Sequence, residues 1–273
     1  DFQDNNDQLF SIIKNFKLYE ILEKSLKKSK YFKKNKFKNN LNYFDKYNIV
    51  INTDHSNLIT QKYFSKKIIK KYNSYAYSCI IDHQNILNDT ATQIFTKKGP
   101  LAFLPISSKK TSIVYSIKNS KKIKDRTIID LINHYNFKYK IKKINKIETF
   151  ELQSINLRCY YHNKFLAFGD LLHKIHPLAG QGFNMTLRDI KILLNIIKKR
   201  KELGLPMDYS INKEFEKKIR HKNFIFSNGI DLIYEFFSLE SKLKSNSFSK
   251  SIKFIGKNPT LNKFFSDIAD QGL

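Results

Sequence analysis

The chain has 273 residues, and its 50 lysines and arginines against 24 aspartates and glutamates give a formal net charge of +26. Hydrophobic residues make up 41% and aromatic residues 14%, which is enough to build the core of one or two domains and excludes an intrinsically disordered or collagen-like chain. Two cysteines, Cys79 and Cys159, are too few for a disulfide framework, and because no zinc-ligand spacing occurs we expect no bound metal.

The positive charge by itself identifies no partner. Phosphate and base recognition favours arginine, whose guanidinium donates two parallel hydrogen bonds, yet lysines supply most of the charge here. The lysines are spread along the chain among Asn, Ile, Tyr and Phe, as AT-rich coding would produce. This compositional origin explains the charge best, an anionic membrane surface comes second, and a nucleic-acid partner is the least favoured interpretation.

No window approaches the roughly eighteen uninterrupted apolar residues that a transmembrane helix needs. The opening DFQDNNDQLF also lacks the basic-then-apolar order of a signal peptide. We therefore expect a cytoplasmic protein, either free or held peripherally on the inner membrane.

The first predicted elements are a helix and a buried strand. Leu9, Ile12, Ile13 and Phe16 follow helical spacing, so we expect an amphipathic helix over about 6–23. After a Lys- and Asn-rich stretch, the apolar run NIVIN ends in Thr53-Asp54, the pattern of a buried strand that places a polar group at its carboxyl end.

The middle of the chain predicts an antiparallel sheet. From about 74 to 117 the apolar residues recur with period two, in the runs YAYSCII, ATQIF, GPLAFLPI and TSIVYSI, and polar residues or Gly and Pro separate these runs. A helix over about 122–134 and a strand at 148–152 follow.

The last part combines a strand, a turn and helices. Residues 164–168 predict a buried strand that ends in Gly169-Asp170, and an irregular turn then leads into a helix. That helix stops at a basic run followed by Gly204 and Pro206. Residues 210–270 have a helical pattern with aromatic anchors.

The segment 169–189 carries the chemistry. The carboxyl end of a strand and the amino end of a helix are favoured ligand sites in α/β sheets. Asp170 can accept hydrogen bonds from sugar or ribitol hydroxyls, and Gly180 and Gly182 let the backbone approach a flat ring. The alternative is an ordinary strand-to-helix turn. We interpret His173 as a packing or capping residue rather than half of a metal pair with His176.

The pattern Gly169-Asp170-x-x-His173-x-x-His176-Pro177-Leu178-Ala179-Gly180-Gln181-Gly182-x-Asn184-x-x-x-Arg188-Asp189 resembles a motif of a known family. It is similar to the second flavin-binding motif of FAD-dependent aromatic hydroxylases, in the ubiquinone-biosynthesis branch related to para-hydroxybenzoate hydroxylase. The segments NDQLFSII, NDTA and GPLAFLP also resemble that branch, in matching order.

This resemblance implies a flavin site and a reaction. Its cofactor-binding residues would be Gly169, Asp170, Pro177, Gly180, Gln181, Gly182, Phe183, Asn184 and Asp54. The cofactors would be FAD and NAD(P)H, which with O2 hydroxylate a polyprenyl phenol at a membrane surface, with other quinone-biosynthesis proteins as further partners. The sequence identifies no acid, base or nucleophile.

The resemblance also implies a far wall for the ring pocket, provided by apolar residues of the substrate sheet. These residues would be Leu101, Phe103, Leu104, Ile113 and Tyr115.

The sequence departs from the family pattern in several places. No glycine precedes Gly99, so the family's G-x-G-x-x-G unit for the FAD pyrophosphate is absent. With Asp1 in place of Met, this predicts a fragment that binds FAD weakly or not at all. Asp54-His55 stands for the family's Asp-Gly, so we expect a different or strained backbone, and Asp54 is either a flavin or nicotinamide contact or an ordinary strand-end residue.

Leu171 and Leu172 replace two small residues of the family motif. We expect their bulk close to the path of the flavin chain.

These elements predict a mixed α/β (α+β) fold. We expect a truncated Rossmann-like FAD domain at 1–73 and 153–205, a substrate-binding antiparallel sheet at 74–152, and C-terminal helices at 206–273. Two other functions stay open, a flavin-free assembly partner in a quinone-synthesis complex and a nucleic-acid-binding protein.

Overall fold

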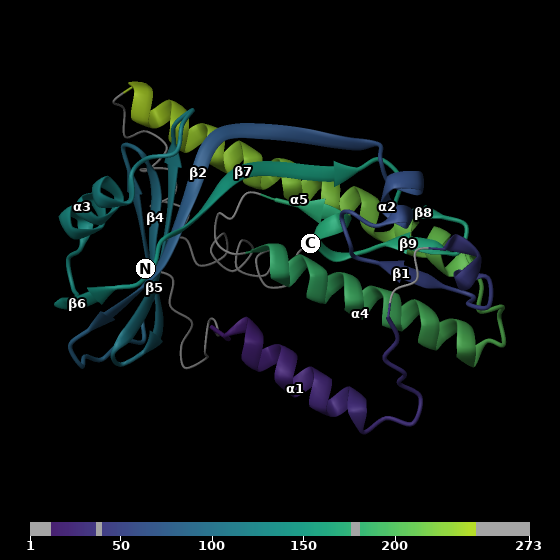
Figure 1. Ribbon diagram of the computed structural model, residues 1–273. Helices are drawn as coiled ribbons and strands as arrows, with labels where there is room; N and C mark the ends of the chain where they lie inside the picture. The colour runs from purple at the N-terminus through teal and green to yellow at the C-terminus, as the bar shows by residue number, and fades with distance from the viewer. Residues whose placement is uncertain (1–11, 37–39, 176–180, 244–273) are drawn as a thin grey trace, which may run out of the picture. The chain divides into compact units, whose positions relative to one another are not determined.

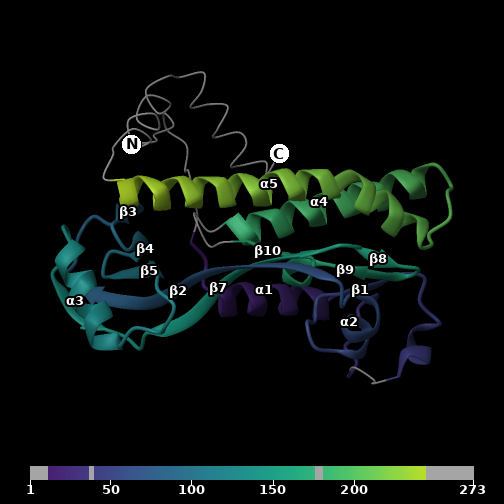
Figure 2. The same ribbon diagram turned by 90° about the horizontal axis from the view of Figure 1, so that it is seen from above.

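The computed structural model describes residues 12–36, 40–175 and 181–243 (Figures 1 and 2). It has the expected mixed α/β fold with antiparallel strands. The chain divides into two compact units, one formed by Asp1–Lys38 and Tyr75–Phe150 and the other by Asn39–Ser74 and Glu151–Leu273. The first unit includes Tyr75–Phe150, close to the range of the expected sheet domain at 74–152, and also Asp1–Lys38, which the sequence placed in the FAD domain at 1–73.

The first unit contains one helix before the sheet and one helix within it. Its elements are α1 (Asn15–Lys27), β2 (Lys67–His83), β3 (Thr92–Thr96), β4 (Gly99–Ser107), β5 (Lys110–Lys118), α3 (Asp125–Tyr135), β6 (Ile141–Ile144) and β7 (Glu148–Leu157). By their bounds, β2 and β7 each continue from one unit into the other. The seven-stranded sheet has the order β10-β7-β2-β5-β4-β3, and β6 pairs with β2.

The core of the first unit lies between its sheet and α3. In the antiparallel pair β4 and β5, Leu101 is opposite Tyr115 and Phe103 is opposite Ile113. All four side chains are fully buried, in one cluster with two isoleucines of α3. The strict alternation of the sequence therefore marks the residues that face the helix.

This burial corrects the expected pocket wall. Leu101, Phe103, Ile113 and Tyr115 have no exposed surface because they pack under α3, so they cannot line an open pocket. Of the five residues named, only Leu104 lies on the opposite face of β4, where it is half-buried.

Gly99, the first residue of β4, lies against the backbone of β5. Its φ is +137°, and a Cβ built there would lie 2.1 Å from the carbonyl oxygen of Ser116. Backbone cannot move aside as the end of a side chain can, so only glycine fits this position.

The second unit combines short strands with two long helices. Its elements are η1 (Leu41–Phe44), β1 (Val50–Asn52), α2 (Leu58–Tyr63), β8 (Tyr161–His162), β9 (Phe165–Ala167), η2 (Gly169–Leu171), β10 (His173–Lys174), α4 (Gln181–Glu202) and α5 (Ser210–Leu243). A three-stranded sheet has the order β1-β9-β8, with β1 and β9 parallel. Figure 2 shows α4 and α5 side by side, and both contribute to the main core of this unit.

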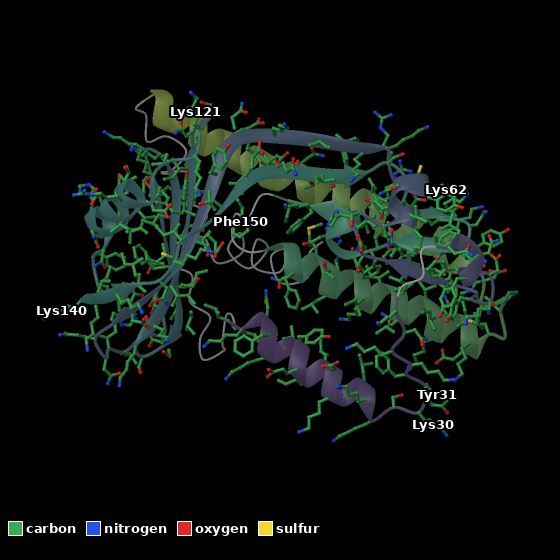
Figure 3. All side chains as sticks on the ribbon, viewed as in Figure 1. Lys30, Tyr31, Lys62, Lys121, Lys140 and Phe150 are labelled. Atoms are coloured by element: carbon green, nitrogen blue, oxygen red, sulfur yellow. The ribbon has the colours of Figure 1, made fainter. Side chains whose placement is uncertain are left out.

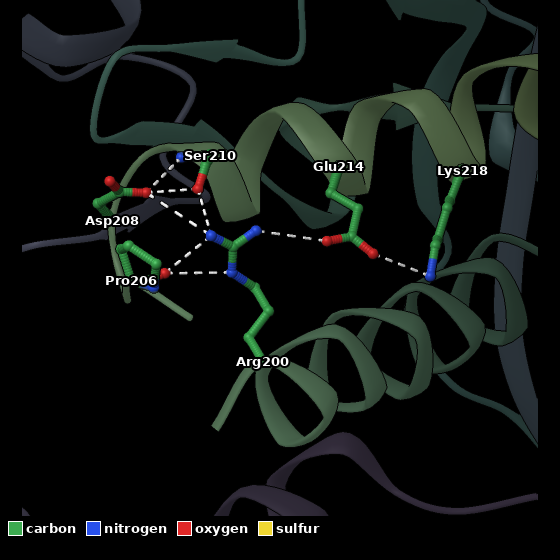
Figure 4. Close-up of polar contacts among 6 residues, drawn as sticks. All are labelled: Arg200, Pro206, Asp208, Ser210, Glu214 and Lys218. Carbon is green, nitrogen blue, oxygen red and sulfur yellow. Dashed lines mark hydrogen bonds and ion pairs between the residues drawn. The ribbon is translucent and has the colours of Figure 1, made fainter. Parts of the chain in front are cut away.

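The helix ends follow the sequence signals closely. The helix α4 ends at Glu202 and Gly204 adopts a φ of +63°, as the stop signal predicts. Arg200 then donates from Nε and Nη2 to the carbonyl oxygen of Pro206, at 3.1 and 2.8 Å (Figure 4). Its Nη1 lies 3.5 Å from Glu214 of α5, so this guanidinium fastens the connection between the two helices.

For two other predicted helices, the structure describes only part of the expected range. The helix expected at about 6–23 is α1, which begins at Asn15 within the described residues. The C-terminal helix expected over 210–270 is described as far as Leu243. No helix in the described ranges is long and apolar enough to cross a membrane.

The lysines are not gathered on one element. The labelled lysines in Figure 3, Lys30, Lys62, Lys121 and Lys140, are all exposed and come from four separate parts of the chain. This spread agrees with a compositional origin of the charge.

Candidate functional site

Two parallel strands end together at the predicted site. Asn52 of β1 is paired with Ala167 of β9, and the N–H of Phe168 donates to the carbonyl oxygen of Asn52 at 2.9 Å. A Cβ built on Gly169 would lie 4.0 Å from Thr53 Cγ2. The segments that carry Asp54 and Asp170 therefore leave the sheet at the same edge, and each aspartate follows its strand as the sequence predicts.

Gly169 turns the chain so that Asp170 faces outward. The φ of Gly169 is +62°, in the left-handed region that favours glycine, and it starts the short helix η2. Asp170 is exposed, whereas Leu171 and Leu172 on its C-terminal side are fully buried. Its carboxylate is thus available to a ligand.

The burial of Leu171 and Leu172 corrects another expectation. Both side chains belong to the main core of the second unit, together with Leu193 and Ile196 of α4. Their bulk therefore fills the protein interior and does not add to the exposed surface around Asp170.

The Asp54 carboxylate accepts hydrogen bonds from residues of its own loop. Its Oδ1 accepts hydrogen bonds from Ser56 N–H at 2.7 Å, Ser56 Oγ at 2.9 Å and Asn57 N–H at 3.1 Å. The Ser56 N–H and hydroxyl are the largest causes that lower the pKa of the Asp54 carboxyl from its usual value. Asn57 in turn caps α2 by accepting from Thr60 N–H at 2.9 Å. The structure therefore favours the ordinary strand-end role for Asp54.

His55 is accommodated without strain. Among the described residues other than glycine, only Asn73 and Asn163 have a positive φ. The strained left-handed backbone, one of the two outcomes expected from the sequence, therefore does not occur at His55.

The amino end of α4 comes directly after Gly180 of the motif. Pro177 and Gly180 lie outside the described residues, as does the side chain of Gln181, which begins the helix. Among the described residues, a Cβ added to Gly182 would meet no heavy atom within 4 Å, so this part of the chain leaves the space beside the glycine open. Phe183 is 54% exposed and Asn184 is also exposed.

The helix α4 also contacts η2, so the amino end of α4 and the Asp170 turn belong to neighbouring segments of the second unit. The first N–H groups of a helix have no acceptor within it, and its amino end carries a partial positive charge. This surface can accept an anionic or carbonyl oxygen.

Behind this surface lies a buried polar network that the sequence did not reveal. His173 Nε2 lies 2.9 Å from Asp189 Oδ2, and both residues are almost wholly buried. Arg188 donates to Asp189 Oδ1 from Nε at 3.1 Å and from Nη2 at 2.8 Å, and Nη2 also donates to Oδ1 of Asn223 in α5. The expected packing role of His173 thus includes a buried hydrogen-bond contact with Asp189.

A sequence signal for this network existed. Asp189 occupies the apolar face of α4, in line with Met185, Leu193 and Ile196, which are all buried. A carboxylate on the buried face of a helix needs partners, because an unpaired charge is costly in the interior.

The donors at this site fit a flavin. Asp170 offers an exposed acceptor for ribitol hydroxyls, the amino end of α4 offers N–H donors, and the open space beside Gly182 leaves room for a flat ring. No group of three or more potential metal ligands occurs among residues 12–36, 40–175 and 181–243.

Comparisons with known proteins give the same picture. No protein-family model matches the sequence. The 3-demethoxyubiquinol 3-hydroxylase of Escherichia coli is 29% identical over 174 residues, which cover 60% of this chain and 44% of that protein. The ubiquinone hydroxylase UbiL of Rhodospirillum rubrum is 23% identical, and the aligned residues cover 61% of this chain and 41% of UbiL. The chain thus spans less than half the length of these relatives.

The fold also matches solved flavoenzymes. HpxO of Klebsiella pneumoniae, in complex with FAD and uric acid, superimposes with a TM-score of 0.57 at 12% identity, covering 82% of this chain and 59% of that one. The tetracycline destructase Tet(51) gives a TM-score of 0.54 at 12% identity, covering 83% and 62%. By sequence, the chain is similar to hydroxylases of ubiquinone biosynthesis, and its fold resembles that of a structure solved with FAD.

Proposed function

We propose that the chain acts in an FAD-dependent aromatic-ring hydroxylase of ubiquinone biosynthesis, which uses NAD(P)H and O2 on a polyprenyl phenol. The observation that carries this proposal is the joint position of the exposed Asp170 carboxylate and the amino end of α4 beside two parallel strand ends. Bound FAD would supply the redox chemistry, taking reducing equivalents from NAD(P)H and activating O2.

The residues of the site would bind and orient the cofactor. Asp170 would accept hydrogen bonds from the ribitol hydroxyls. The N–H groups of Gln181, Gly182 and Phe183 would stabilise negative charge at the N1–C2 carbonyl edge of the flavin ring, and such a preorganised donor contributes about 3–4 kcal/mol in a dry site. Asp54 would hold the neighbouring loop through its bonds to Ser56 and Asn57.

The sheet face opposite α3 is an apolar surface of the first unit. Ala102, Leu104, Ile106 and Val114 lie on this face and are half-buried, so it offers apolar surface that the core of the unit does not use. An apolar ring with a polyprenyl chain suits such a surface.

Because polyprenyl phenols partition into bilayers, we place the protein in the cytoplasm, peripheral on the inner membrane. The net charge of +26 supports attraction to an anionic lipid surface. Further quinone-biosynthesis proteins remain proposed partners. The flavin-free and nucleic-acid alternatives have less support, since the relatives are named as hydroxylases and the lysines are dispersed.

A chimera tests the proposal. The N-terminal part of the Escherichia coli relative, which by family resemblance carries the glycine-rich FAD unit, is joined ahead of these 273 residues. We call this protein the flavin chimera, and express it in a strain that lacks the Escherichia coli enzyme. We expect it to bind FAD and to restore ubiquinone, whereas its Asp170→Ala variant should lose both properties.

The matched control is Asp208→Ala, which removes a partly exposed carboxylate in the α4–α5 connection. It should leave flavin content unchanged. A folded, FAD-containing chimera that restores no quinone hydroxylation would refute the proposed function.

A further inference from the structure

The buried network of α4 connects the two ends of the segment that we assign to the flavin. In the sequence, His173 precedes this segment and Asp189 follows it within α4, so the contact between them joins its two ends. We propose that Asp189, held by His173 and Arg188, is the positioning residue that sets the orientation of the first turn of α4. The identification of flavin as the group this turn receives rests on the proposed function.

The network holds Asp189 from two directions. One carboxylate oxygen, Oδ2, takes the His173 Nε2 contact at 2.9 Å, and the other, Oδ1, takes both Arg188 donors. Because a carboxylate accepts and does not donate, His173 must carry its proton on Nε2 in this contact. Arg188 continues the chain of contacts to Asn223, so β10, α4 and α5 are fastened at one point.

Apolar packing alone would not give this orientation. The other buried residues of α4, including Met185, Leu193 and Ile196, make contacts that are not directional and tolerate small rotations of the helix. Two carboxylate oxygens with fixed partners do not tolerate such rotation. A buried ion pair is in general no more stabilising than apolar residues of the same size, so its value here lies in orientation.

Rotation of α4 would matter most at its amino end. Gly182 lies two helical turns before Asp189 in the same rigid helix. A rotation of α4 about its axis therefore redirects the N–H groups of residues 181–183. The network thereby controls where these donors point, although none of its members belongs to the exposed surface of the site.

Hydrogen–deuterium exchange of the 273-residue chain without flavin tests this inference. We compare wild type with Asp189→Asn and with His173→Phe, and follow the amides of residues 185–188, which donate to the first turn of α4 and are protected while that turn is formed. Asp189→Asn leaves the buried Arg188 guanidinium without its carboxylate, and His173→Phe leaves Oδ2 of Asp189 without its hydrogen bond, so local opening should become about 100-fold more frequent and exchange of these amides should accelerate by that factor. His173→Gln keeps an N–H donor and should stay within about threefold of wild type.

Leu193→Ala is the matched control, because Leu193 is buried in α4 but packs in the apolar core outside the network. This variant should lower overall stability and accelerate exchange no more at 185–188 than elsewhere in α4. If Asp189→Asn does not fold, the pair His173→Phe and His173→Gln decides the question. Exchange that is unchanged, or accelerated uniformly along α4 in His173→Phe, would overturn the inference.

Flavin binding separates this inference from the proposed function. In the flavin chimera, His173→Phe should shift the flavin absorption bands and lower FAD affinity, while His173→Gln restores both. If the unmodified chimera binds no FAD but the exchange results hold, the proposed function fails and the orienting role of Asp189 in α4 stands.

Discussion

Gly182→Ala should leave the protein stable and yet impair flavin binding. A Cβ built at Gly182 meets no heavy atom within 4 Å, so the added methyl group makes no clash. Alanine is also favoured over glycine in helices by about 0.5–1 kcal/mol. We therefore expect the thermal midpoint of the 273-residue chain to stay constant or to rise by about 2–4 °C.

The Gly182→Ala substitution lowers FAD affinity only because the flavin ring would occupy the space beside this residue. Inserting a methyl group into a filled contact costs about 1–3 kcal/mol, so the Gly182→Ala flavin chimera should bind FAD about 10- to 100-fold more weakly. Fluorescence titration of FAD measures this loss.

Gly229→Ala is the matched control, because Gly229 lies in α5 and an added Cβ there also meets nothing within 4 Å. It should give the same small gain in stability and no loss of FAD affinity. Equal FAD affinity in the Gly182→Ala and Gly229→Ala chimeras would refute the placement of the ring beside Gly182.

Three further predictions test the remaining structure. Gly99→Ala should destabilise the protein by about 3 kcal/mol or more in urea unfolding, because its Cβ would lie 2.1 Å from the Ser116 carbonyl oxygen; an unchanged midpoint would contradict this. Hydrogen bonds lower the folded-state pKa of Asp54, so they stabilise the protein above the ordinary aspartate pKa, and this advantage is lost as pH falls through the folded value. Asp54→Asn should accordingly be less stable than wild type at pH 7, with the difference shrinking towards pH 3; a constant difference would oppose the assignment. Burial raises the pKa of the Cys79 thiol to about 11, so a thiol reagent at pH 8 should modify Cys159 in the native protein and Cys79 only after denaturation.

The local pattern of the sequence determined the elements and the motif. Period-two alternation identified β4 and β5, and the stop signals placed the end of α4 close to Gly204. The order of strand, Gly169-Asp170 and helix start located the candidate site, because each of these features depends on neighbours in the chain. The outward direction of Asp170 followed from the same signals.

Tertiary structure decided which way the apolar residues face and how buried charges pair. Alternation separates the two faces of β4 but does not tell which face α3 covers, so Phe103 was expected in a pocket and lies in the core. Leu171 likewise fills the interior. The network around Asp189 includes His173 of β10, which contacts Asp189 directly, and Asn223 of α5, which accepts from Arg188. Only the packing of these separate segments brings the residues together. Local propensity acts through near neighbours, whereas burial and charge pairing depend on segments distant in sequence.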